Sequence, residues 1–238
     1  MFDNPLTGTP FSYLGMPPQV IFLDAAGTLI TLCEPVGVTY ARVAATHGVV
    51  VDAVAIGRAF RSSWKALPPP VHPSPPPDDD RGWWRALVEH AFALVLGQSV
   101  PAQVMGPLFS DLYDFFARPA AWAVYEDVRP ALDRLKPHFR LLVLSNFDQR
   151  LRQILQGHGL LGYFEDVIIS SEIGASKPHP RIFEAALLRA GVDAASCLHV
   201  GDDEKADAAG AEGQGIPHFL VRRPGAGLEE LAEKLLSG

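Results

Sequence analysis

The chain has 238 residues, of which 48% are hydrophobic and 20% are charged, so it can form one large domain or a core domain with a smaller insertion. Its formal net charge of −7 argues against a nucleic-acid-binding surface, and no apolar run approaches the roughly eighteen residues that span a bilayer. Two cysteines are too few for a disulfide framework or a four-ligand zinc site. Residues 1–18 predict an irregular N-terminal arm without the features of a signal peptide, so we expect a cytoplasmic protein.

Short apolar runs rich in β-forming residues, each followed by a polar or glycine turn, predict the buried strands. They lie at Val20–Leu23, Leu141–Leu144, Val167–Ile169, Leu198–Val200 and His218–Val221. Helical patterns alternate with these runs, and two of the helices, at residues 148–156 and 180–190, are each followed by a glycine stop. Near-continuous apolar strands alternating with helices predict an α/β fold with a doubly wound, Rossmann-like parallel sheet.

The spacing of the first two strands predicts an insertion. About 115 residues separate them, whereas one crossover helix needs only about a dozen. The intervening segment, residues 34–119, is rich in aromatic residues and in helical pattern, and we interpret it as a helical cap domain. The Rossmann-like core is then expected to comprise residues 19–33 and 120–238.

A proline-rich stretch interrupts the predicted cap. Pro68–Pro77 contains seven prolines, so it predicts an extended loop, and a ligand for an SH3-type domain is a less favoured interpretation. Asp78, Asp79 and Asp80 follow, and they predict the acidic first turn of the helix that carries Trp83 and Trp84.

Polar residues follow the predicted strands at four places. Ligands of open parallel sheets bind beyond the carboxyl ends of the strands, so these residues are expected to converge. They are Asp24, the pair Ser145-Asn146, Lys177, and the pair Asp202-Asp203. Taken singly, each also fits a turn, a helix cap or a solvated side chain.

The last of these places is an acidic cluster that a structural role alone explains poorly. Asp203 and Asp207 are four residues apart on a predicted helix, where like charges repel each other. Lys205 relieves part of that repulsion, and a hard divalent cation held by carboxylates would offset more. The sequence therefore predicts a magnesium site built from Asp24 and Asp202.

Four motifs occur in order at the predicted strand ends: Asp24-Ala25-Ala26-Gly27-Thr28-Leu29, Leu144-Ser145-Asn146, Lys177-Pro178 and Gly201-Asp202-Asp203. Through them, about residues 19–223 resemble the haloacid dehalogenase superfamily of hydrolases. Within the superfamily, residues 144–151 and 177–183 and the pair Trp83-Trp84 are similar to the subgroup called haloacid dehalogenase-like hydrolase domain-containing protein three.

The resemblance implies phosphoryl transfer in two steps on a small phosphorylated metabolite. Asp24 would attack phosphorus as the nucleophile, and water would then hydrolyse the aspartyl-phosphate. Ser145, Asn146 and Thr28 would bind the substrate, and Lys177 would neutralise negative charge on the nucleophile and the phosphate. A monomer or a homodimer is expected, with neither nucleic acid nor membrane as partner.

The resemblance also implies a Mg²⁺ cofactor. Its ligands would be Asp24, the backbone carbonyl of Ala26, and Asp202, with Asp203 or Asp207 in support. Catalysis would then consist mostly of positioning and electrostatic stabilisation.

The sequence departs from the superfamily pattern at one position. Phosphatases of the superfamily usually carry a second aspartate two residues after the nucleophile, and here that residue is Ala26, which cannot transfer a proton. Losing a general acid–base costs on the order of 10²–10⁴ in rate. Three interpretations stay open: a phosphatase for good leaving groups or with another proton donor, a dehalogenase- or phosphonatase-type hydrolase, or a catalytically weak binding protein. In the phosphonatase case Lys65, the only lysine of the predicted cap, would bind the substrate as a Schiff base.

Overall fold

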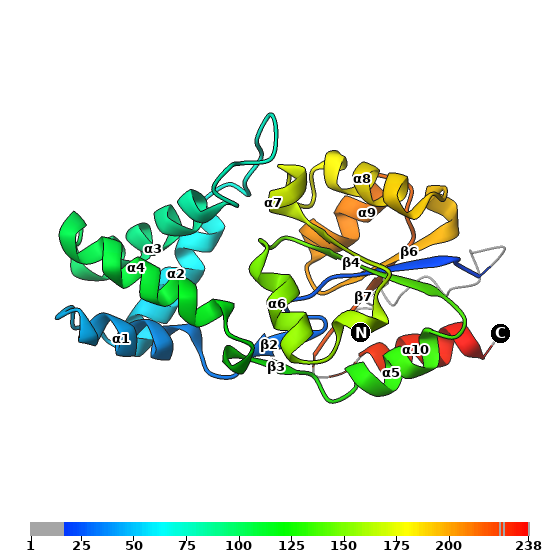
Figure 1. Cartoon of the computed structure of the whole chain (residues 1–238), viewed down its shortest axis with the longest axis horizontal. Helices are drawn as coiled ribbons and strands as arrows, with labels where there is room; N and C mark the ends of the chain where they lie inside the picture. Colours follow the sequence, from blue (N-terminus) through cyan, green and yellow to red (C-terminus); the bar gives the residue numbers. More distant parts are fainter. Residues whose placement is uncertain (1–16, 224, 226, 238) are drawn as a thin grey trace, which may run out of the picture.

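The core of the molecule is a five-stranded parallel sheet with strand order β5-β4-β1-β6-β7 (Figure 1). The computed structural model describes residues 17–223, 225 and 227–237, so most of the predicted N-terminal arm lies outside the described residues. The strands are β1 Val20–Leu23, β4 Arg140–Ser145, β5 Asp166–Ile169, β6 Cys197–Gly201 and β7 His218–Leu220. The predicted parallel sheet is confirmed, with each strand within one residue of its expected bounds.

The central strand β1 pairs in parallel with two strands that lie far along the chain. Val20 is in register with Arg140 of β4 and with Cys197 of β6. Every residue of β1 is fully buried, because Ile21 and Leu23 pack into the core on one face of the sheet while Val20 and Phe22 pack into the core on the other. Burial on both faces explains why the strand is apolar throughout instead of alternating with polar residues.

Helices cover both faces of this sheet (Figure 1). One face packs against α5 Val128–Leu135, α6 Arg150–Gly157 and α10 Leu228–Leu236. The other packs against α7 Ser170–Ile173, α8 Pro180–Ala190 and α9 Gly210–Glu212. The helix predicted at residues 180–190 has those bounds and ends at a left-handed Gly191, whereas α6 begins two residues later than expected. Short 3₁₀ turns complete the core at Pro119–Ala121, Leu161–Tyr163 and Ala194–Ser196.

A small antiparallel pair of strands, absent from the sequence prediction, stands beside the main sheet. Here β2 Ile30–Leu32 pairs with β3 Trp122–Val124. Each strand has three residues, and the whole insertion separates them, so no local pattern indicated their pairing. The pair forms the base from which the inserted segment leaves the core and returns to it.

Four helices lie between β2 and β3: α1 Val36–Thr46, α2 Ala53–Ala66, α3 Arg81–Leu96 and α4 Ala102–Ala117. We call residues 36–117 the helical insertion. It has a buried apolar cluster of its own, separate from the two clusters that flank the sheet, and it stands to one side of the sheet in Figure 1. Among the described residues, no helix has both the length and the apolar character needed to cross a membrane.

The proline-rich stretch is an extended loop, as predicted, and it contacts the core. We call residues 67–80 the proline strap. Val71 forms an antiparallel bridge with Ala175, and the His72 backbone N–H donates to the Gly174 carbonyl at 2.8 Å. The strap therefore links the helical insertion to the loop that follows α7, in addition to the two chain connections through β2 and β3.

The three aspartates at the end of the strap do not form the predicted acidic first turn of α3. Only Asp78 supports that helix, by accepting from the Gly82 backbone N–H at 2.8 Å. Asp79 and Asp80 have positive φ angles of 56° and 60°, so their side chains take other partners. Asp79 accepts from the Ser171 hydroxyl at 2.5 Å and from the backbone N–H of Gln149 at 2.9 Å. Asp80 pairs with His72 at 2.7 Å.

Candidate active site

The polar residues expected to converge meet at the carboxyl edge of the sheet. Asp24 directly follows β1, Ser145 ends β4, and Lys177 lies in the loop between α7 and α8. The Lys177 ammonium donates to Asp24 Oδ1 at 2.8 Å, and the Ser145 hydroxyl donates to the same oxygen at 2.9 Å. Side chains more than 120 residues apart in sequence therefore hold the Asp24 carboxylate in one orientation.

Lys177 is buried, with 2% of its surface exposed, and its ammonium is fully hydrogen-bonded. It donates to Asp24, to Asp207 Oδ1 at 2.6 Å, and to the Leu144 carbonyl at 2.8 Å. Three oxygens thus use the three N–H donors of an ammonium group. The side chain of Asn146 exchanges two hydrogen bonds with the Lys177 backbone, at 2.6 and 2.9 Å, and so positions this residue.

Asp207, which the sequence placed only in a supporting role, lies at the centre of this group of contacts. Its carboxylate binds Lys177, the His199 ring at 2.9 Å, and the backbone N–H groups of Asp202 and Asp203 at 3.1 and 3.0 Å. It lies on a π-helical turn, Glu204–Ala209, that follows β6. The Asp207 carboxylate can lie against the end of β6 only because residue 201 is a glycine. A Cβ at Gly201 would lie 2.1 Å from the Asp207 carboxyl carbon.

A group of three carboxylates lies at this edge. Asp24, Asp202 and Asp207 each offer an oxygen within 4.8 Å of the others. Asp203, expected as a metal ligand, is outside this group among the described residues, because its carboxylate accepts from the backbone N–H groups of Lys205 and Ala206 at 2.8 and 2.7 Å. It acts as a helix cap, and Asp207 takes its place in the acidic group.

Burial and charge together set the protonation of these groups. Burial raises the pKa of Asp24 to about 6, although the nearby Lys177 ammonium opposes that rise. Burial also acts to raise the pKa of Asp207, but Lys177 and His199 outweigh it and hold that pKa below its usual range. Burial lowers the pKa of His199. The neutral ring can then donate its Nε2 proton to Asp207.

The charges of the site suit a hard divalent cation. Three ionised carboxylates and one ammonium give −3 + 1 = −2 in a small, largely buried region. Mg²⁺ prefers oxygen ligands and is commonly held by one or two carboxylates together with water and substrate phosphate. Asp202 is exposed at the rim, where Thr28 Oγ lies 3.4 Å from its Oδ1, so an ion could reach it from solvent. The donors present therefore fit the ion.

Two other residues predicted for the site lie on exposed positions. Ala26 is exposed two residues after Asp24, next to the Ala26–Ile30 bridge, so a longer side chain would have room there. Lys65 is exposed in the last turn of α2, and in the part of the chain that the structure describes no hydrogen bond or ion pair joins it to Asp24.

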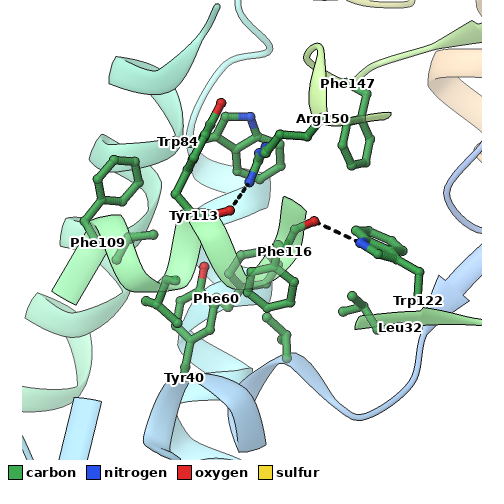
Figure 2. A pocket seen from close by; sticks show the side chains of 13 residues that line it. Leu32, Tyr40, Phe60, Trp84, Phe109, Tyr113, Phe116, Trp122, Phe147 and Arg150 are labelled. Atoms are coloured by element: carbon green, nitrogen blue, oxygen red, sulfur yellow. Dashed lines mark hydrogen bonds between the residues drawn. The ribbon is translucent and has the colours of Figure 1, made fainter. Parts of the chain in front are cut away.

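An aromatic pocket, which the sequence did not reveal, lies between the core and the helical insertion (Figure 2). It has a volume of about 90 Å³, and its walls include Tyr40 and Trp84 from the insertion and Trp122 and Phe147 from the core. Arg150 covers one side: its guanidinium stacks 3.6 Å from the ring centre of Tyr113 and pairs with buried Asp148 at 2.6 Å. The only sequence signal was the abundance of aromatic residues in the insertion, which is equally typical of a buried core.

Relatives and a family model match most of the chain. The model of the haloacid dehalogenase-like hydrolase matches residues 18–215. Haloacid dehalogenase-like hydrolase domain-containing protein 3 of Mus musculus is 40% identical over 210 residues, which cover 85% of this chain and 81% of that protein. The Homo sapiens protein of the same name is 35% identical, with coverage of 87% and 83%.

Solved structures share the fold at lower identity. The magnesium-bound HAD-hydrolase YfnB of Bacillus subtilis superposes with a TM-score of 0.71 at 16% identity, covering 92% of this chain and 99% of that one. The L-2-haloacid dehalogenase of Xanthobacter autotrophicus gives a TM-score of 0.63 at 22% identity, covering 93% and 83%. With the predicted motifs gathered at one edge of the predicted sheet, and with the family model matching across that core, the chain belongs to the haloacid dehalogenase-like hydrolases.

Proposed function

We propose that the chain is a magnesium-dependent phosphoryl-transfer hydrolase that acts on a small phosphorylated molecule through an aspartyl-phosphate. The observation that carries this proposal is the Lys177 ammonium, which lies 2.8 Å from Asp24 and 2.6 Å from Asp207 at the edge where Asp202 completes the acidic group. A fixed positive charge beside a buried carboxylate is suited to a nucleophile that must approach an anionic phosphate.

The reaction has two steps. A carboxylate oxygen of Asp24 attacks phosphorus, the bond from phosphorus to the leaving oxygen breaks, and that oxygen departs with the electron pair. Water then attacks the phosphorus of the aspartyl-phosphate, the Asp24–phosphorus bond breaks, and the carboxylate and inorganic phosphate are released with one proton passing to solvent. Ser145 and Lys177 keep the Asp24 carboxylate in one orientation throughout.

Asp24, Asp202 and the backbone carbonyl of Ala26 would hold the magnesium ion. When bound, the ion neutralises charge on the phosphate oxygens. Asp207 positions this region, because it binds Lys177 and two backbone N–H groups of the β6 loop. We further propose that the helical insertion, residues 36–117, acts as a cap that recognises the rest of the substrate, and that the enzyme is cytoplasmic.

Ala26 restricts the substrates that this site can hydrolyse. Its methyl group cannot protonate a leaving oxygen, so the reaction favours phosphates whose leaving group departs unprotonated. The same residue supports a second candidate function, dehalogenation, because halide ions also leave without a proton. Release of chloride from L-2-chloropropionate would favour that second function.

The test uses acetyl phosphate, which has a good leaving group, with Mg²⁺ and with a chelator. Phosphate release should require Mg²⁺, and Asp24→Asn should abolish it, whereas Asp133→Asn, at an exposed carboxylate of α5, should keep the wild-type rate. Acid-quenched wild-type protein should carry a phosphoryl group on Asp24 by mass spectrometry. Equal rates for wild type and Asp24→Asn would overturn the proposal.

A further inference from the structure

The aromatic pocket begins next to the catalytic edge of the sheet. Phe147, which forms part of its wall, is two residues after Ser145, and the Ser145 hydroxyl bonds the nucleophile Asp24. Leu32 of β2 and Trp122 of β3 add a second wall from the core side. Apart from Arg150 of α6, the rest of the lining comes from the helical insertion, so the pocket lies between the insertion and the part of the core that carries Ser145.

The walls of the pocket are suited to a small flat ring. Four of its aromatic side chains, from Tyr40, Trp84, Phe116 and Phe147, surround the space drawn in Figure 2. Its volume is about 90 Å³, whereas an enclosed apolar cavity of ~150 Å³ binds benzene. A single ring can therefore enter only in part, with its remainder in the open mouth of the pocket, and a nucleotide is too large. Aromatic rings pack favourably against such a ring in stacked or edge-to-face geometry.

The pocket carries no charge that calls for a charged ligand. Arg150 is the one charged residue of its lining, and the fully buried Asp148 carboxylate already pairs with it at 2.6 Å. The Tyr113 carbonyl takes another of its N–H donors at 3.1 Å. A second anion would therefore find the guanidinium already neutralised, and an uncharged ligand fits better.

The Tyr40 hydroxyl is one of three polar groups in the pocket wall, with the Tyr113 hydroxyl and the Trp84 Nε1–H, that bond no described residue. Tyr40 is 3% exposed, and its hydroxyl oxygen keeps some access to solvent, so a ligand that displaced water there without accepting its hydrogen bond would leave it unsatisfied at a cost. Figure 2 shows this hydroxyl directed from the lower wall into the space between the labelled side chains. Burial raises the pKa of Tyr40, so the hydroxyl keeps its proton and can act as a donor. A ligand with a hydrogen-bond acceptor would satisfy it.

We infer that the substrate is an aryl phosphate whose uncharged ring occupies the aromatic pocket and whose ring substituent accepts a hydrogen bond from Tyr40. This inference rests on the proposed function and names its substrate class. It also accounts for Ala26: a phenol ionises near pH 10 and water only near 15.7, so an aryloxide leaves far more readily without a proton donor than an alkoxide does. When Asp24 attacks phosphorus, the phosphorus–oxygen bond to the ring breaks, and the aryloxide takes the electron pair and later a proton from solvent.

The first experiment measures a ratio of rates. Wild-type protein with Mg²⁺ is given 4-acetylphenyl phosphate, whose carbonyl can accept from Tyr40, and phenyl phosphate, which has no such acceptor. Tyr40→Phe keeps the ring and removes the hydroxyl, so the ratio of the two kcat/KM values should fall about tenfold, the effect of one hydrogen bond. Tyr163→Phe, which changes an exposed hydroxyl bonded to Asp133, should keep the wild-type ratio. An unchanged ratio in Tyr40→Phe would overturn the inference.

The second experiment needs no turnover. Calorimetric titration with 4-hydroxyacetophenone, the dephosphorylated product, should show binding to the wild-type protein that weakens about tenfold in Tyr40→Phe and is unchanged in Tyr163→Phe. If acetyl phosphate is hydrolysed in an Asp24-dependent manner while this phenol fails to bind, the inference fails and the proposed function stands. If the phenol binds but Asp24→Asn leaves acetyl phosphate hydrolysis unchanged, the proposed function fails instead.

Discussion

At the carboxyl edge of the sheet, Lys177 donates to three oxygens and Asp207 accepts from four partners, whereas in the aromatic pocket the hydroxyl of Tyr40 has no partner among the described residues. We propose that the two regions have different tasks. A site that performs chemistry needs groups held in one geometry before the substrate arrives. A site that recognises the organic part of a ligand can leave a donor for that ligand to satisfy.

The largest effect should come from removing the positive charge of Lys177, which lies between the carboxylates at the carboxyl edge of the sheet. Lys177→Met keeps much of the side chain but leaves Asp24 and Asp207 buried without their cation, so the free energy of unfolding should fall by about 3–5 kcal/mol. Urea denaturation measures this loss. Lys234→Met removes an exposed i,i+4 pair with Glu230 and should cost less than about 0.5 kcal/mol. Similar losses in the two variants would contradict the assigned role of Lys177.

The next effect tests whether a proton donor is all that the site at Asp24 lacks for the hydrolysis of alkyl phosphates. Ala26→Asp places a carboxyl group at an exposed position two residues after the nucleophile, so hydrolysis of an alkyl phosphate should rise by about 10²-fold. Phosphate release from glycerol phosphate measures it. Ala26→Asn, equal in size and unable to exchange a proton, is the matched control, and an equal gain in both variants would show that proton transfer is not the cause.

A smaller effect concerns the proline strap, which joins the helical insertion to the core loop that follows α7. Gly174 has φ 72°, and a Cβ there would lie 2.9 Å from the Ser74 backbone in the strap, whereas Gly191 has φ 65° and no atom within 4 Å of the same position. Both alanine variants strain the backbone, but Gly174→Ala must also displace the strap, so it should cost about 1 kcal/mol more. Thermal unfolding compares the two, and cleavage of residues 68–77 by a protease should accelerate only in Gly174→Ala.

The last comparison separates a hydroxyl that has a hydrogen-bond partner from one that has none among the described residues. Ser145→Ala removes the donor to Asp24 and should destabilise the ligand-free protein by about 1–2 kcal/mol, whereas Tyr40→Phe should change its stability by less than about 0.5 kcal/mol or raise it. Chemical denaturation of both variants measures the difference. A loss for Tyr40→Phe as large as that for Ser145→Ala would mean that Tyr40 has a structural role.

The sequence predicted the residues at the carboxyl edge of the sheet better than those of the aromatic pocket, and the reason is physical. Asp24 and Ser145 lie at the ends of buried strands, and the parallel sheet brings such ends together whatever the intervening chain does. The choice between Asp203 and Asp207 could not be predicted, because it depends on the π-helical winding of residues 204–209, which turns Asp207 inward and leaves Asp203 to cap the turn.

The pocket was beyond sequence reasoning because its residues are of the types that fill cores. Tyr40 and Phe60 pack edge to face in the insertion, with ring centres 5.5 Å apart, and nothing in their spacing along the sequence distinguishes a pocket wall from solid packing. The β2–β3 pair was missed for a related reason: three-residue strands separated by the insertion have no turn that marks them. The docking of the proline strap depends on backbone hydrogen bonds, which are independent of side-chain identity.

The central position of β1 has a consequence for the synthesis of the chain. This fully apolar strand leaves the ribosome early, but one of its partners starts at Arg140 and the other at Cys197. At a translation rate of about 5–20 residues per second, Val20 waits roughly 10–35 seconds for Cys197 to be made. During that interval the nascent chain exposes an unpaired hydrophobic strand, which makes it prone to aggregation and a suitable client for chaperones. Asp24, the proposed nucleophile that follows this strand, gains its bond to Lys177 only after the last third of the chain has been made.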